Sequence, residues 1–219
     1  MTPLTDRLGL PVDRGPRILV VSSHPDDAEI AAGGTIARLV AERPDVDVTW
    51  LVLAAADPAR AAEARGSAER LLAGAARARI DLGTLRDSYL PYLGPAAKEA
   101  IAAHAGFDPD LILSPRRDDA HQDHSHVAEL VPQVFRRATV LEFEIPKWDG
   151  DLGPANLYVP LSAAEAAAKV AHVLAAFPSQ NDRAWFTADT LRAILRLRGI
   201  ECRAPEGLAE AFVCRKIVV

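Results

Sequence analysis

Two short clusters of histidine and aspartate residues are the part of this sequence most suited to chemistry. The first is His24-Pro25-Asp26-Asp27, and the second spans residues 118–126 and contains three of the six histidines in the chain. Imidazole nitrogens and carboxylate oxygens are ligands of Zn²⁺ in proteins, and a centre with only three protein ligands keeps a coordination position for water. The two clusters together predict a metal-dependent site that activates water.

The positions of the clusters in the chain indicate how they would meet. Each follows a short apolar run that predicts a buried strand, at residues 18–21 for the first cluster and 111–113 for the second. In open parallel α/β sheets, ligands bind beyond the carboxyl ends of the strands. We therefore expect the fold to bring the two clusters together, although they are far apart in the sequence.

Short apolar runs alternate with alanine-rich helical segments along the chain, which is typical of βαβ units. Further strands are predicted at residues 48–54, 140–145 and 212–219. One helix is predicted from the N-cap Asp57 to about Ala75, and another after a capping box of Ser162 and Glu165. A third is predicted across residues 127–135, with a kink or an early end at Pro132. A fourth begins at Gly33-Gly34-Thr35, where glycine allows close backbone approach. The predicted fold is α/β and Rossmann-like, with a mostly parallel sheet flanked by helices. It forms a single domain over residues 1–219, in which residues 1–16 are an N-terminal extension.

The composition limits the classes of function. The chain has 219 residues, of which 49% are hydrophobic and 25% charged, as in ordinary globular proteins, and its formal charge of −5 does not favour nucleic acid or anionic membranes as partners. Two cysteines are too few for a disulfide framework. The charged N-terminal segment does not resemble a signal peptide, and no apolar run has the length of a membrane span. We expect a cytoplasmic protein that acts on a small molecule, with a homo-oligomer as an open alternative to a monomer.

The paired motifs resemble those of the PIG-L/LmbE-type zinc-dependent de-N-acetylases, which remove acetyl groups from sugars of the N-acetylglucosamine type. That family has a His-Pro-Asp-Asp motif after its first strand and a later Asp-x-His-x-Asp-His motif, here His24 to Asp27 and Asp119 to His124. The resemblance extends over nearly the whole chain. Two departures are Ala28, which precedes Glu29 where the family more often has glutamate directly, and Gln122, which replaces the usual proline. Neither removes a residue that would bind metal.

The resemblance implies a role for each residue of the two motifs. The metal ligands that it implies are His24, Asp27 and His124. Asp26 would be the general base, and His121, in its protonated form, would stabilise the oxyanion. The resemblance implies zinc, although two histidines and one carboxylate also suit Fe²⁺.

Two further aspartates of the second motif are expected to orient the histidine rings without binding the metal. Asp123, and with it Asp119, would hold an imidazole ring in place through the ring nitrogen that does not face the metal.

Five other residues are expected to contact substrate, with a solvated surface charge as an equal alternative for the charged ones. They are Arg117, Lys147, Trp148, Arg183 and Arg60. Arg60 and Glu63 are similar to an Arg-x-x-Glu pair of the family, but an ion pair across one helical turn explains them equally well.

The function predicted from these residues and the resemblance is that of a zinc-dependent N-deacetylase. It would hydrolyse the acetamide of an N-acetylated amino sugar or sugar conjugate with metal-activated water. One alternative is an amidase that acts on a thiol-sugar conjugate at the same metal site. Another is a metal-binding or sugar-binding module without catalysis, against which Asp26 argues, because a binding site needs no base.

Overall fold

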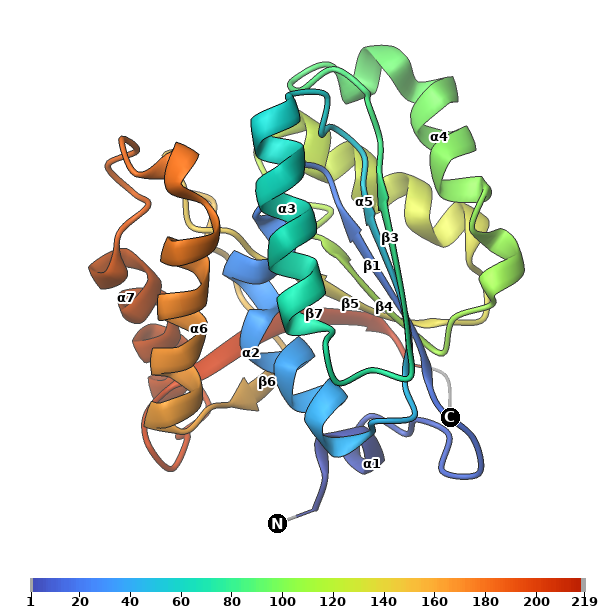
Figure 1. Cartoon of the computed structure of the whole chain (residues 1–219). Helices are drawn as coiled ribbons and strands as arrows, with labels where there is room; N and C mark the ends of the chain where they lie inside the picture. Colours follow the sequence, from blue (N-terminus) through green and yellow to red (C-terminus); the bar gives the residue numbers. More distant parts are fainter. Residues whose placement is uncertain (1, 218–219) are drawn as a thin grey trace.

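The computed structural model describes residues 2–217, which form a seven-stranded sheet in the order β3-β2-β1-β4-β5-β7-β6 (Figure 1). The first five strands in this order run parallel, and β7 is antiparallel to both β5 and β6. The strands are β1 (Arg17–Ser22), β2 (Asp47–Val52), β3 (Arg77–Leu82), β4 (Leu111–Pro115), β5 (Thr139–Phe143), β6 (Leu157–Pro160) and β7 (Ala209–Lys216). The predicted α/β fold with a mostly parallel sheet is confirmed.

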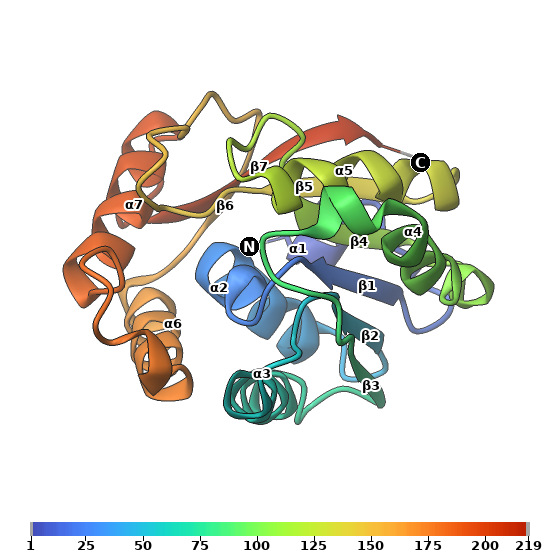
Figure 2. The same cartoon turned by 90° about the horizontal axis from the view of Figure 1, so that it is seen from above.

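Helices cover both faces of the sheet (Figure 2). The α-helices are α1 (Leu4–Arg7), α2 (Asp27–Glu42), α3 (Pro58–Leu71), α4 (Gly94–Ala102), α5 (Gln122–Val134), α6 (Ala163–Ala176) and α7 (Ala188–Glu201), and the 3-10 helices are η1 (Leu90–Leu93), η2 (Ala105–Phe107) and η3 (Pro178–Gln180). None of these helices is both long and apolar enough to cross a membrane.

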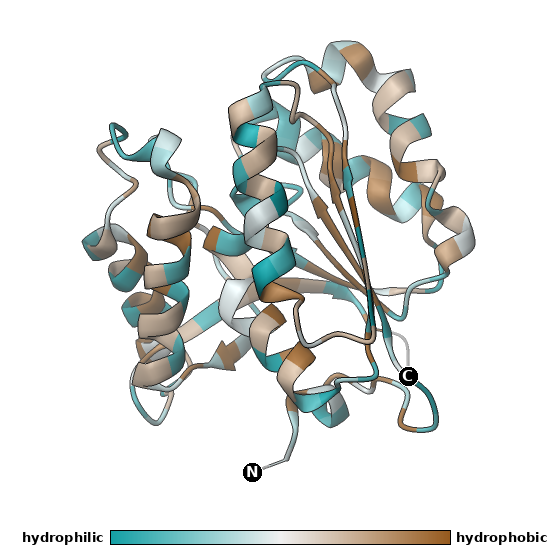
Figure 3. Ribbon diagram, viewed as in Figure 1, coloured by the Kyte–Doolittle hydropathy of each residue, from teal (hydrophilic) through white to brown (hydrophobic). Residues whose placement is uncertain are grey.

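Strand β1 separates two hydrophobic cores. Ile18 and Val20 point into the core that also contains side chains of α2, α3, α6 and α7. Leu19 and Val21 point into the second core, which contains side chains of α4 and α5. The central strands are accordingly hydrophobic on both faces, as their colour in Figure 3 shows, and this fits a strand between two helical layers.

Strands β3 and β6 were not predicted, for physical reasons that differ. Strand β3 lies at one edge of the sheet, and its polar and apolar residues alternate and are exposed or half-buried, so it lacks the apolar run of a central strand. Strand β6 has four residues, lies at the opposite edge and ends in Pro160. The strand predicted at residues 212–219 begins earlier, at Ala209, and residues 218–219 lie outside the described part of the chain.

Helix α2 begins at Asp27, within the first motif and six residues before the predicted start at Gly33. The glycines therefore lie inside the helix. A Cβ atom on Gly34 would come within 2.8 Å of Leu161 Cδ1. The Gly34 backbone N–H donates to Glu210 Oε1 at 2.8 Å. The predicted close backbone approach is thus confirmed, with a carboxylate of β7 as the partner.

The two predicted helix caps are present, and both fix helices that flank the sheet. Asp57 accepts a hydrogen bond from the Arg60 backbone at the start of α3. Ser162 and Glu165 form the capping box of α6. Pro132 lies in the last turn of α5, which ends at Val134, as expected for a helix that a proline shortens.

Most of the N-terminal extension is part of the packed structure. Leu4 of helix α1 is buried in the first core, and so are Leu8 and Leu10, which follow the helix. The Thr5 backbone N–H donates to Glu42 Oε2 of α2 at 3.1 Å. This segment therefore covers the end of α2 away from the two motifs.

The capping box predicts a pH-dependent contribution to stability. Burial alone would raise the pKa of Glu165, but hydrogen bonds from Arg38 and Ser162 outweigh burial and lower this pKa to about 2 from an ordinary 4.5. Because the folded-state pKa is lowered, the stabilisation is complete above pH 4.5 and is lost as the pH falls towards 2. We expect Glu165→Gln to lower the free energy of unfolding by up to about 1 kcal/mol at pH 7, because it removes the charge that pairs with Arg38. Urea unfolding should show a clearly smaller difference at pH 2.5 than at pH 7, because most of the stabilisation is lost between pH 4.5 and pH 2. An equal difference at both pH values would contradict the assignment.

Candidate metal and catalytic site

The first motif forms a tight turn between β1 and α2. Asp26 has a φ of 93°, a left-handed conformation that is uncommon for a residue other than glycine and that tends to occur at functional sites. The His24 backbone N–H donates to Asp27 Oδ2 at 2.8 Å, which closes the turn. His24 and Asp27 are thereby held on the same side of the loop.

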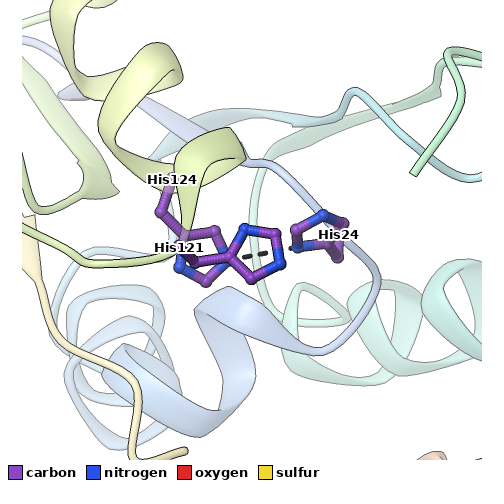
Figure 4. A group of neighbouring side chains, drawn as sticks. All are labelled: His24, His121 and His124. Carbon is purple, nitrogen blue, oxygen red and sulfur yellow. Dashed lines mark hydrogen bonds between the residues drawn. The ribbon is translucent and has the colours of Figure 1, made fainter. Parts of the chain in front are cut away.

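The second motif forms the loop between β4 and α5 and the first turn of that helix. His121 is the N-cap, and its Nδ1 accepts a hydrogen bond from the Asp123 backbone N–H at 3.2 Å. The His121 backbone N–H donates in turn to Asp119 Oδ1 at 2.8 Å. Because β1 and β4 are adjacent and parallel, this loop lies beside the first motif. His24, His121 and His124 point toward one another across the gap between the two segments (Figure 4).

The three predicted metal ligands converge. His24 Nδ1 lies 3.1 Å from His124 Nε2. The Asp27 oxygens lie 3.4 Å from His124 Nε2 and 3.8 Å from His24 Nδ1. All three residues are at most 9% exposed. The structure therefore places two imidazole nitrogens and a carboxylate around one buried point.

The outer nitrogens of both rings face other carboxylates. Asp123 Oδ2 lies 3.1 Å from His24 Nε2, and Asp119 Oδ2 lies 3.0 Å from His124 Nδ1. A carboxylate at the outer nitrogen favours a proton there, so the inner nitrogen presents its lone pair. With their lone pairs directed inward, the two imidazole nitrogens and the Asp27 carboxylate form one set of donors for a cation. This donor set fits Zn²⁺ or Fe²⁺.

The charges around the ligands favour such a cation. Burial lowers the pKa of His124, but Asp27 and Asp119 outweigh burial and raise this pKa to about 9. Burial likewise opposes protonation of His24, and Asp123, Asp27 and Asp87 raise its pKa well above the ordinary value. Burial would raise the pKa of Asp27, but His124 and His24 hold it well below its usual range. The carboxylates thus stabilise positive charge at the convergence point.

His121 lies close enough to be an alternative ligand. One of its ring nitrogens is within 4.8 Å of ring nitrogens of His24 and His124, and its ring stacks on that of His124 with centroids 4.7 Å apart. Its Nδ1 accepts from a backbone N–H, so in the neutral ring Nε2 carries the proton. Burial lowers the pKa of His121, and the charges of His124 and His24 lower it further. These observations favour a neutral His121 over the protonated form expected from the sequence.

The Asp26 carboxyl lies beside the ligands and is 6% exposed. Burial raises its pKa and Asp27 adds to that rise, while Arg60 opposes it, so that the pKa of Asp26 is about 7. Arg60 Nη2 lies 3.3 Å from Asp26 Oδ2 and donates to the Pro25 carbonyl at 2.6 Å. Arg60, predicted as a substrate contact, thus contacts the predicted base.

Asp123 is fully buried and joins His24 to the loop that follows β3. Its Oδ2 accepts from the Ser88 backbone N–H at 2.8 Å, and its Oδ1 accepts from that of Leu90 at 3.1 Å. The same loop places Asp87 Oδ1 at 3.1 Å from His24 Nε2. Sequence reasoning missed Asp87 because it missed β3. Had that strand been recognised, the residues after it would have been expected at the same edge of the sheet.

His24, Asp87 and Asp123 form a second group with the composition of a metal site. This group lies at the outer nitrogen of His24. Because both Asp123 oxygens accept backbone hydrogen bonds, we interpret the group as the support that orients His24.

The other predicted substrate contacts lie in the loops around the site. The Lys147 side chain is 7% exposed, and its ammonium lies 2.9 Å from Asp119 Oδ1 and 2.7 Å from Asp151 Oδ2, so it joins two loops. Trp148, Arg117 and Arg183 are exposed. Glu63 does not pair with Arg60 but accepts hydrogen bonds from Ser179.

Comparisons with known proteins are consistent with this geometry. Residues 19–135 match the family model for PIG-L, described as GlcNAc-PI de-N-acetylase. Among solved structures, the N,N'-diacetylchitobiose deacetylase from Pyrococcus horikoshii is 19% identical, with 95% of this chain and 88% of that chain covered and a TM-score of 0.69. The zinc-inhibited form of the teicoplanin deacetylase Orf2 is 17% identical over 90% of this chain and 96% of that one, with a TM-score of 0.66.

One similar structure is that of an enzyme whose name gives a different reaction. GalB, the 4-carboxy-2-hydroxymuconate hydratase from Pseudomonas putida, is 16% identical over 93% of this chain and 98% of that one, with a TM-score of 0.71. At these identities the structural matches establish the fold alone, and the reaction has to be argued from the site.

The convergence of His24, Asp27 and His124 predicts that metal affinity depends more on Asp27 than on His121. Asp27→Ala should weaken Zn²⁺ binding at least about a hundredfold, because it removes a predicted metal ligand. Loss of a ligand should lower the affinity more than loss of a residue that only supports a ligand. His121→Ala should weaken it less than about tenfold. Competition with a chromophoric chelator measures both affinities. A larger loss in the His121 variant than in the Asp27 variant would show that the three histidines are the ligands instead.

Proposed function

This chain belongs to the PIG-L family, and from that premise we propose that it is a zinc-dependent N-deacetylase that hydrolyses the acetamide of an N-acetylated amino sugar or sugar conjugate. One observation carries the proposal. The buried Asp26 carboxyl, with a pKa of about 7 that Asp27 and His24 influence, belongs to the same tight turn as two of the three converging side chains that would bind metal. A base next to a metal centre is what attack by water requires and what a binding module does not need.

His24, Asp27 and His124 are the residues that would hold the metal. Zn²⁺ at this position would supply Lewis-acid chemistry, lowering the pKa of water and polarising the acetamide carbonyl. We favour zinc over iron because of the family to which the chain belongs. Asp123 and Asp119 contribute by keeping the protons of both imidazoles on their outer nitrogens.

Asp26 moves the proton. Its pKa of about 7 leaves a substantial fraction as carboxylate at neutral pH, so it can accept a proton from the attacking water. The resulting carboxylic acid can then donate that proton to the departing amine, which completes the hydrolysis. The Arg60 contact at 3.3 Å fixes the carboxyl group and favours its charged form.

His121 donates a hydrogen bond in its neutral form. Because Nδ1 is occupied by the Asp123 backbone N–H, the ring offers Nε2–H to the substrate. The acetamide oxygen gains negative charge when water attacks, and a donor fixed at that position commonly lowers the barrier by a few kcal/mol. Its place as the N-cap of α5 holds the ring in this orientation.

The substrate class rests on the family and on two of the similar structures. Their names identify deacetylases of N,N'-diacetylchitobiose and of a teicoplanin, which supports a sugar-linked acetamide here. We propose a small, sugar-containing molecule as substrate in a cytoplasmic protein. The thiol-sugar amidase is retained as an alternative because it would use the same metal and base with different surrounding loops.

The general-base role predicts a specific loss of turnover. Asp26→Asn should keep Zn²⁺ content near wild type and lower kcat at least about a hundredfold, because the amide cannot accept the proton of water. Metal analysis and a primary-amine assay measure the two effects. The exposed Asp189→Asn is the matched control and should leave both unchanged. An Asp26 variant with wild-type turnover would exclude this residue as the base.

A substrate panel tests the reaction class. Zinc-loaded protein should release primary amine and acetate from at least one of free N-acetylglucosamine, its glycosides, its nucleotide-linked form and a thiol-linked conjugate. Amine release from the thiol-linked conjugate alone would favour the amidase alternative. Failure with every N-acyl substrate, together with hydration of an unsaturated acid such as the GalB substrate, would contradict a deacetylase.

A further inference from the structure

Trp148, in the loop after β5, contacts Trp185, in the loop before α7. The Trp148 side chain is 66% exposed, although indole is large and apolar. Its ring meets that of Trp185 edge to face, with centroids 6.3 Å apart and an angle of 87°. Trp185 contacts Phe186 at 5.7 Å, and Phe186 is 2% exposed. The three rings thus form a row that begins in the hydrophobic core and ends in solvent.

The loop that carries Trp148 is fastened to the second motif at two points. The Lys147 ammonium lies 2.9 Å from Asp119, whose other oxygen lies 3.0 Å from His124. Asp151 accepts a hydrogen bond from the Ala120 backbone N–H at 2.8 Å and also pairs with Lys147. Trp148 lies between these two anchors, next to the residue that contacts a supporting aspartate of the site.

The loop that carries Trp185 is fastened to the first motif through α3. Glu63 accepts hydrogen bonds from the Ser179 backbone N–H at 2.9 Å and from its hydroxyl at 2.5 Å. Arg60, one helical turn earlier, donates to the same hydroxyl at 3.5 Å and contacts Asp26. The loop between α6 and α7 is therefore connected to the predicted base by a short series of polar contacts.

From these contacts we propose that Trp148 and Trp185 form a binding platform for a second ring attached to the N-acetylated sugar. This inference rests on the proposed function and names the substrate more closely. The two loops lie on the side of the molecule where the carboxyl ends of the strands meet (Figure 2). Exposed indole faces bind flat groups with apolar faces, such as aryl rings and the C–H faces of sugar rings.

The charges near the platform favour a neutral ring over a phosphorylated group. Lys147 is neutralised by Asp119 and Asp151. The exposed charged residues closest to the tryptophans in the sequence are Asp149, Asp182 and Arg183, which together carry one negative charge. The platform therefore takes a neutral aryl or glycosyl group, and the preferred substrate is a conjugate and not free N-acetylglucosamine.

Kinetics on matched substrates test the platform. We expect wild-type kcat/KM to be about tenfold higher for an aryl N-acetylglucosaminide, for the β1,4-linked disaccharide of N-acetylglucosamine, or for both, than for free N-acetylglucosamine. Trp148→Ala should remove this advantage by lowering kcat/KM for the two-ring substrates about tenfold more than for the free sugar. Trp148→Phe should restore part of it. The exposed Tyr92→Ala, which removes an aromatic ring from a different loop, is the matched control and should not alter the ratio.

Binding to the inactive Asp26→Asn protein separates this inference from the proposed function. Calorimetry should show tighter binding of the two-ring ligands than of the free sugar, and Trp148→Ala in that background should abolish the difference. Equal kcat/KM for free and conjugated sugars in active wild-type protein would overturn the platform and leave the deacetylase intact. The same loss of preference in Tyr92→Ala would also overturn it. Absence of any deacetylation, with a preference in binding that depends on Trp148, would overturn the proposed function alone.

Discussion

The site depends on one electrostatic constraint, the approach of His24 Nδ1 and His124 Nε2 to 3.1 Å beside the Asp27 carboxylate. Carboxylates lie at the outer nitrogen of each ring, so the inner nitrogens converge beside Asp27 in an arrangement that suits a metal cation. The base role proposed for Asp26 depends on this point, because a carboxylate can accept a proton from metal-activated water only if it is close to the metal. The two ligands come from segments far apart in the chain, so the constraint is met only when the sheet has formed.

The fold meets this constraint by placing strongly held loops at the ends of adjacent parallel strands. β1 and β4 pair directly and deliver the two motifs to one edge. Asp123 then fixes the loop after β3 against His24. Behind the site, a buried ion pair of Lys169 and Glu210 at 2.5 Å connects α6 to β7, and Glu210 also accepts from the backbone of α2. Breaking such a buried pair costs about 3–5 kcal/mol, so α2, which begins with Asp27, is firmly anchored.

The sequence was sufficient for the fold class, the central strands and the convergence of the two motifs, because apolar runs and their polar ends have strong local signals. Metal ligation and the base remain predictions that the geometry supports. The edge strand β3 was missed because polar residues interrupt its apolar ones, and Asp87 was missed with it, since its contact with His24 arises only in three dimensions. The tautomer of His121 depends on a backbone N–H of its own helix cap. The burial of Lys147 between two aspartates depends on how two loops pack, which no local pattern encodes.

The most direct test is a crystal structure of the zinc-loaded protein with anomalous diffraction data at the zinc edge. The account predicts one strong peak about 2.0–2.2 Å from His24 Nδ1, His124 Nε2 and an Asp27 oxygen, with Asp26 close by but not coordinated. A peak bound by His121 in place of Asp27 would contradict the assigned ligands. A peak at the outer nitrogen of His24, between Asp87 and Asp123, or no peak at the motifs at all, would contradict the central claim that these inner nitrogens form the metal site.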